Sequence, residues 1–274
     1  MMLGMRKMGI MTRNTTTEAF FLDTYSAIGA YSWNQLSGSA TNCIRLREDG
    51  GSTESNFGFS SRFLDTTAVT AFLSGAGGHG VTWFDQKNSN DLAQASAVPQ
   101  PGYTTTGYQF TSGNGDFLSK SGLTFDLAIG QAWTIACWAD FGATPVSTES
   151  LIRSTGAGND LLQMQITSGR KLNSLIRDSV NPIKNVTSTT SLPADTVMAY
   201  LIIEHTAASA DIVVNFNGSS ETMSNAVPAG ANDITFLAIP HSGSIFHTMK
   251  YKTFVFGNSL MDAAEKALFI GLES

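Results

Sequence analysis

The chain has 274 residues, of which 42% are hydrophobic, so it can bury a large core as one big β domain or two smaller ones. Its net charge is −6 and it has no run of Lys or Arg, which argues against nucleic-acid binding through phosphate contacts. Only 14% of the residues are charged, so we expect a surface built largely from Ser, Thr, Asn and Gly. No apolar run approaches the ~18 residues that span a membrane, and we expect no membrane insertion.

Residues 1–18 contain basic residues and several methionines. They lack the continuous apolar stretch and the small-residue cleavage site of a signal peptide, so we expect no secretion by that route. The pattern predicts an extended N-terminal arm that is ordered only where another protein docks on it.

Residues 19–101 mix helical and strand patterns. Apolar residues at helical spacing predict a short helical face over residues 20–31. Residues 43–47 alternate as a strand, and residues 64–73 are typical of a helix with Asp65 as its N-cap, ended by the glycine-rich residues 75–80. Residues 81–84 form the next predicted strand, and Pro99 and Pro101 mark the end of the segment. We expect this segment to pack onto the part of the chain that follows.

From residue 102 to residue 274 the pattern is almost entirely β. Short apolar stretches recur between turn signals such as Asn217-Gly218, a pair that tolerates positive φ at both positions. Such spacing with few helices predicts an antiparallel β-sandwich. A helix capped by Ser259 is predicted over residues 259–270. The predicted strands cover residues 108–110, 133–139, 151–153, 161–166, 171–177, 197–204, 212–216, 234–239 and 246–256.

The strand at residues 133–139 alternates, and we expect one of its faces to join the core between two sheets. This strand carries Cys137, and the other cysteine, Cys43, also lies among apolar residues. Two cysteines far apart in apolar surroundings predict buried free thiols, with a disulfide as the alternative.

The most distinctive string, VTWFDQKNSNDLAQA, covers residues 81–95 and turns from apolar to polar at Asp85. One interpretation is an active-site loop in which Trp83 and Phe84 bury Asp85 and raise its pKa. The other, which we favour, is a strand end at which Asp85 and Gln86 bond backbone groups of the following loop.

Two resemblances cover about residues 20–270. Residues 108–118, 133–138, 212–218 and 252–265 resemble, in order, motifs of the concanavalin A-like lectin/glucanase sandwich of laminin-G type, which implies a mainly β jelly roll. Residues 22–32, 44–47, 57–59, 64–66 and 81–86 follow a pattern seen in bacteriophage structural proteins, which is similar to part of the catalytic domain of α-L-arabinofuranosidase B. That enzyme pattern has Ser-Gly-Asn-Gly where this chain has Lys87-Asn-Ser-Asn90, and it has cysteines that this chain lacks.

The sequence alone assigns no catalytic residue. Glycoside hydrolysis needs two carboxyl groups at close spacing, and no pair is recognisable among the Asp and Glu residues. No His or Cys lies at zinc-ligand spacing, so we expect no metal. A calcium ion is the weaker alternative, with oxygen donors from Asn114, Asp116, Asn159 and Asp160. Because sugars stack on exposed aromatic rings, the candidate carbohydrate-binding residues are Trp33, Tyr103, Trp138 and Tyr251.

These observations and the resemblances predict a non-enzymatic bacteriophage virion protein, such as a fibre, decoration protein or adhesin. The arm at residues 1–18 would attach it to other virion proteins, residues 19–101 would pack on the sandwich, and the sandwich at residues 102–274 would contact host-surface glycan. A homo-oligomer is expected, because multivalency replaces single-site affinity in such proteins. The alternatives are a glycoside hydrolase resembling α-L-arabinofuranosidase, or a secreted carbohydrate-binding module.

Overall fold

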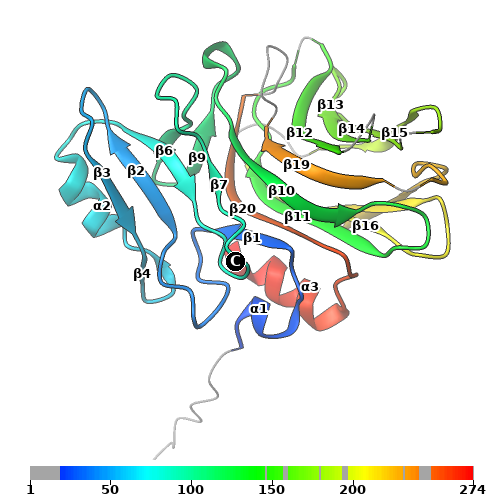
Figure 1. Cartoon of the computed structure of the whole chain (residues 1–274), viewed down its shortest axis with the longest axis horizontal. Helices are drawn as coiled ribbons and strands as arrows, with labels where there is room; N and C mark the ends of the chain where they lie inside the picture. Colours follow the sequence, from blue (N-terminus) through cyan, green and yellow to red (C-terminus); the bar gives the residue numbers. More distant parts are fainter. Residues whose placement is uncertain are drawn as a thin grey trace, which may run out of the picture.

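The computed structural model describes residues 19–145, 147–156, 160–178, 180–192, 197–230, 232–240 and 248–273. The predicted arm at residues 1–18 lies outside them. The molecule is mainly β, with a two-layered antiparallel sandwich and a smaller lobe beside it (Figure 1). We call this smaller part the N-terminal lobe; it contains the elements between residues 44 and 104.

The first sheet of the sandwich has strand order β18-β17-β16-β11-β20, and both β1 and β9 pair with the other edge of β20. Its strands are β1 (Gly29–Ser32), β9 (Gly107–Phe110), β11 (Trp133–Asp140), β16 (Met198–His205), β17 (Ile212–Phe216), β18 (Ser219–Met223) and β20 (Met249–Gly257). The second sheet has order β15-β14-β13-β12-β19-β10. Its strands are β10 (Leu118–Asp126), β12 (Glu149–Gly156), β13 (Leu161–Ile166), β14 (Lys171–Arg177), β15 (Lys184–Ser191) and β19 (Asp233–Ile239).

The N-terminal lobe continues the hydrogen bonding of the first sheet through β9 and β8 to β6, β2 and β3. Strand β7 joins β6 to β10 of the second sheet. The lobe consists of β2 (Ile44–Glu48), β3 (Glu54–Phe57), β4 (Phe59–Ser60), β5 (Phe63–Leu64), α2 (Thr66–Leu73), β6 (Gly78–Trp83), β7 (Leu92–Ala93) and β8 (Gly102–Thr104). The predicted N-cap of α2 is confirmed, because the Asp65 carboxylate accepts the Ala68 N–H at 3.0 Å.

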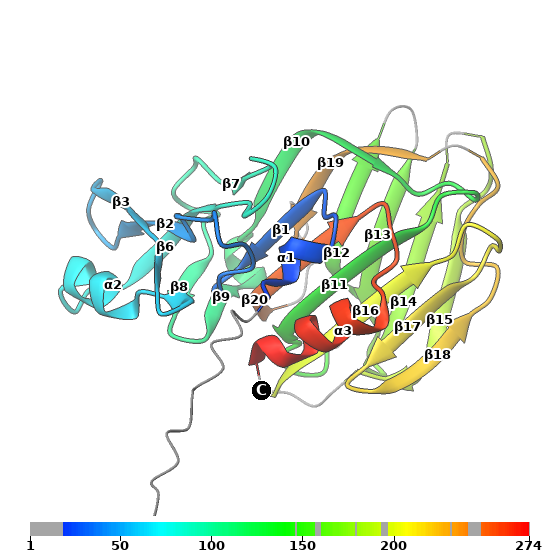
Figure 2. The ribbon, with the colours of Figure 1, turned by 90° about the horizontal axis from the view of Figure 1, so that it is seen from below.

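Both faces of β11 are buried, whereas the alternation predicted that one face joins the core. Trp133, Ile135 and Cys137 enter the core between the sheets. Trp138 on the opposite face lies under two helices, α1 (Phe21–Thr24) and α3 (Ala263–Ile270), in a second cluster that contains Phe269. Figure 2 shows both helices lying across the first sheet. The helices provide an apolar cover that a strand pattern by itself does not reveal.

Two helix predictions need correction. Residues 20–31 do not form one helical face: α1 ends at Thr24, and β1 begins at Gly29 and pairs with β20. The close approach of the Phe256 ring, 2.5 Å from where a Cβ on residue 29 would lie, explains why a glycine stands there. The C-terminal helix is capped by Asp262, three residues after the predicted Ser259, because Asp262 and Glu265 form a capping box. Both cysteines are free and buried, as predicted.

Candidate functional site

A polar groove with a volume of about 360 Å³ lies where β6 ends. It is lined by residues 39–42 and 84–87 together with Ser89 and Asp91. The distinctive polar string therefore forms one wall, and the segment before β2 forms the other. A groove of this size with carboxylate, amide and hydroxyl groups suits a small polar ligand.

Asp85 holds this loop together. Its carboxylate accepts four backbone N–H groups, from Ala30, Lys87, Asn88 and Asn90, at 2.9 to 3.0 Å. Burial raises the pKa of Asp85, and the four N–H donors oppose that rise because they favour the charged form. With both oxygens engaged, Asp85 positions the loop, in agreement with the favoured interpretation of the string.

The neighbouring side chains attach the loop to the segments on either side of β1. The Gln86 amide donates to the carbonyls of Ser32 and Asn34 and accepts the Leu36 N–H at 2.6 Å. The amides of Asn88 and Asn90 both donate to the Ile28 carbonyl. Gln86, predicted to bond backbone groups of the following loop, instead bonds a segment fifty or more residues earlier in the chain.

Asp91 is the carboxyl group in this groove with the fewest bonds. Its Oδ1 accepts the Asp85 N–H at 2.9 Å, and no further hydrogen bond of Asp91 occurs among the described residues. Lys87 lies on the same wall and donates from Nζ to the Leu22 carbonyl at 2.9 Å. The groove thus offers a carboxylate oxygen that a ligand hydroxyl can reach.

Asp116 is a second carboxyl of chemical interest, in the loop before β10. It is almost fully buried, its Oδ2 accepts the Thr111 N–H at 2.9 Å, and its Oδ1 has no partner within the described part of the chain. Burial raises the pKa of Asp116 to about 6. This carboxyl does not line the polar groove.

The structure buries three of the four aromatic residues that the sequence suggested for sugar binding. Trp33, Trp138 and Tyr251 lie in the cores, and the Trp138 indole donates to the Phe269 carbonyl at 2.9 Å. Tyr103 is half-buried, stacks on Trp33 with ring centroids 5.3 Å apart, and lines a smaller groove of about 250 Å³ beside α2. Sugar contact at Tyr103 stays a prediction, whereas the other three rings are covered by their own fold.

The donors considered for calcium do not converge in the described residues. Asp160 accepts the Asp233 N–H at 3.2 Å, Asp116 lies in its own turn, and Asn159 is outside the described part of the chain. Within that part, no group of three or more His, Cys, Asp or Glu side chains is placed to hold a metal ion. Nor does any described helix have the length and apolar character to cross a membrane.

The fold is similar to that of known glycosidases. Over 90% of this chain it matches an arabinofuranosidase complexed with arabinofuranosyl-α-1,2-xylobiose, at a TM-score of 0.64 and 11% identity, and a GH54 α-L-arabinofuranosidase at 0.63 and 10%. Over 86% of this chain it matches a sialidase of Trypanosoma rangeli, at a TM-score of 0.51 and 12% identity. The chain spans 62% and 63% of the two arabinofuranosidase chains and 45% of the sialidase chain. No protein-family model and no curated protein sequence matches it.

These comparisons correct the functional prediction from sequence. A non-enzymatic bacteriophage virion protein is wrong as the leading interpretation, because the solved structures described above, which share the fold over most of this chain, are glycoside hydrolases. The comparisons give no support to a phage origin, and the fold that they show is shared with the hydrolase alternative. The β-sandwich part of the prediction is confirmed.

Proposed function

We propose that this protein is a glycoside hydrolase that releases arabinofuranosyl units from a polysaccharide. The observation that carries the proposal is the similarity of its fold to two arabinofuranosidases over 90% of the chain. The sandwich makes up a smaller share of the chain than this, so the similarity extends into the N-terminal lobe. The polar groove beside Asp91 supports the proposal, because its volume of about 360 Å³ and its polar lining suit one or two sugar units.

Glycoside hydrolysis places carboxyl groups on either side of the bond that breaks, one to donate a proton to the leaving oxygen and one to act as nucleophile or base. In this proposal Asp91 is the catalytic carboxyl that contacts the sugar, since its Oδ1 alone is engaged among the described residues. Asp85 is a positioning residue, because its four amide bonds fix the loop and its N–H orients the Asp91 carboxylate. Lys87 on the same wall donates from Nζ to the Leu22 carbonyl and so also helps to hold this loop in place.

Release of nitrophenolate from 4-nitrophenyl α-L-arabinofuranoside by the full chain tests this function. The wild type should hydrolyse the substrate, and Asp91→Asn should lower kcat/KM by about 10²- to 10⁴-fold. Asp233→Asn, an exposed carboxyl at the start of β19, is the matched control and should keep wild-type activity. A folded wild type without activity, or an Asp91→Asn variant with full activity, would contradict the proposal.

A further inference from the structure

A second groove, with a volume of about 540 Å³, lies between the β4–β5 hairpin and the C-terminal end of α3. Arg62 and Phe63 of the hairpin form one side, Leu268 and Leu272 form the other, and Asn34 and Gln35 line it as well. None of these residues lines the polar groove beside Asp91. The two grooves are therefore distinct but adjacent: the Gln35 amide donates to the carbonyl of Ala40, which lines the polar groove, at 2.9 Å.

The hairpin that borders this groove has a strained turn. Strands β4 and β5 pair through Ser60 and Phe63, so Ser61 and Arg62 are the two central residues of the turn. Both have left-handed backbone conformations, with φ of 51° and 72°. Such turns favour Asn-Gly, because other residues lose free energy in this conformation. A two-residue hairpin loop requires this conformation, and it places Phe63 directly after the turn.

The strained turn presents an aromatic ring to solvent. Phe63 is 58% exposed, and no other aromatic side chain among the described residues is as exposed. Beside it, the Arg62 guanidinium stacks over the Phe20 ring at 3.9 Å and donates to the Ala19 carbonyl at 3.3 Å. The site thus combines an open apolar ring with a fixed cation.

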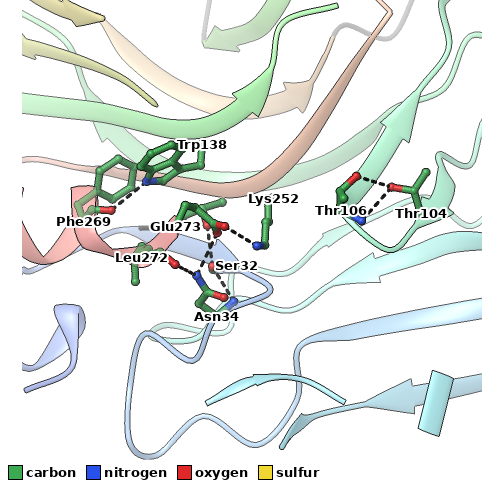
Figure 3. A network of polar contacts seen from close by, with 10 residues as sticks. Ser32, Asn34, Thr104, Thr106, Trp138, Lys252, Phe269, Leu272 and Glu273 are labelled. Atoms are coloured by element: carbon green, nitrogen blue, oxygen red, sulfur yellow. Dashed lines mark hydrogen bonds and ion pairs between the residues drawn. The ribbon is translucent and has the colours of Figure 1, made fainter. Parts of the chain in front are cut away.

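Asn34 adds a buried polar group to the groove. Figure 3 shows its amide nitrogen directed at the C-terminal residues, where it donates to the Leu272 carbonyl at 2.5 Å and to Glu273 Oε1 at 3.0 Å. Asn34 is 4% exposed, and its Oδ1 has no hydrogen-bond partner in the described part of the chain. A buried acceptor without a partner is costly, and a ligand hydroxyl would satisfy it.

We propose that this groove is a glycan-binding subsite, separate from the groove that carries Asp91, with Phe63 as the platform on which a sugar ring stacks. A sugar has an apolar ring face for Phe63, and its hydroxyl groups can donate to the amide oxygens of Asn34 and Gln35 and accept from the Arg62 guanidinium. The choice of a glycan as the ligand rests on the proposed function. This subsite holds a polymer next to the groove in which the bond is cut, so it acts on substrates long enough to occupy both grooves.

Affinity electrophoresis of the full chain through native gels that contain soluble arabinoxylan tests the subsite. The polysaccharide should retard the wild type. Phe63→Ala should bind about tenfold more weakly, because an aromatic stacking contact is lost. Phe63→Trp should keep the binding. Val98→Ala, a change at a side chain that is 82% exposed, is the matched control and should behave as the wild type.

Two further readouts separate this inference from the hydrolase proposal. Hydrolysis of 4-nitrophenyl α-L-arabinofuranoside should be unchanged in Phe63→Ala, because its single sugar unit needs only the groove beside Asp91. Unfolding in urea should show that the variant is as stable as the wild type. Wild-type retardation of a stable Phe63→Ala variant, or no retardation of the wild type, would overturn the subsite. Retardation that depends on Phe63 without any hydrolysis would support the subsite and contradict only the proposed function.

Discussion

Replacement of Asp85 by Ala tests the interpretation of the distinctive loop most sharply. The change removes the acceptor of four backbone N–H groups. The bonds from Lys87 and Asn88 lie in exposed surroundings, where water can take the place of the carboxylate. The bonds from Ala30 and Asn90 are partly buried, so the loss of stability comes mainly from these two.

The expected loss of stability in Asp85→Ala follows from counting only the two partly buried bonds. A hydrogen bond to a charged group contributes roughly 1.5–3 kcal/mol, so two such bonds contribute about 4 kcal/mol. The burial that raises the pKa of Asp85 opposes this gain, because it disfavours the carboxylate. We therefore expect Asp85→Ala to lower the free energy of unfolding by about 3 kcal/mol. Asp85→Asn keeps one acceptor oxygen, so it should lower the free energy of unfolding by about half as much.

Urea unfolding followed by tryptophan fluorescence at pH 7 measures these changes. Asp126→Ala is the matched control, because among the described residues the Asp126 carboxylate accepts one local N–H, from Ala128 at 2.8 Å. This variant should lower the free energy of unfolding by about 1 kcal/mol or less. Hydrogen exchange at the Ala30 amide should also accelerate in Asp85→Ala. If Asp85→Ala were as stable as the Asp126→Ala control, the loop would not depend on this carboxylate and the reasoning would be refuted.

Two more predictions concern stability. Burial raises the pKa of Asp116 from an ordinary 3.8 to about 6, so the folded state binds this proton more tightly than the unfolded state does. The protonated carboxyl therefore adds to the free energy of unfolding. This contribution is full below about pH 4 and is lost as the pH rises through 6. Between pH 4 and pH 7 the wild type should lose about 2 kcal/mol of its free energy of unfolding through this group, whereas Asp116→Asn, which cannot ionise, should not. Urea unfolding at the two pH values measures this, and an equal pH dependence of both proteins would contradict the prediction. Asp262→Ala removes half of the capping box of α3 and should lower the free energy of unfolding by about 1 kcal/mol, whereas an unchanged value would show that the cap contributes nothing.

The strands that the sequence predicted best are those with regular alternation. The predicted residues 161–166, 171–177 and 212–216 coincide with β13, β14 and β17. Strand β15 was missed because it lies at an edge of the second sheet and is mostly polar, with Val186 packing against the core. Strand β10 was missed as well, because an irregularity between Ser121 and Phe125 interrupts its alternation.

The candidate sites were harder to predict than the strands. The polar string indicated that Asp85 bonds backbone groups, and those bonds within residues 87–90 are local. Its bond to Ala30 and the wall of the groove formed by residues 39–42 depend on how distant segments meet, which no local pattern encodes. Phe63 carried no signal, because a Phe between Arg62 and Leu64 gives no indication of which of the two apolar side chains is exposed. The burial of Trp138 depends on a helix from the other end of the chain.

A structure of the chain with bound arabinofuranosyl-α-1,2-xylobiose would test the central claim directly. We expect the arabinofuranosyl unit to lie in the groove beside β6, with a hydroxyl or the glycosidic oxygen within hydrogen-bond distance of the Asp91 carboxylate. A sugar bound elsewhere on the molecule, with the groove beside Asp91 empty of ligand, would contradict it.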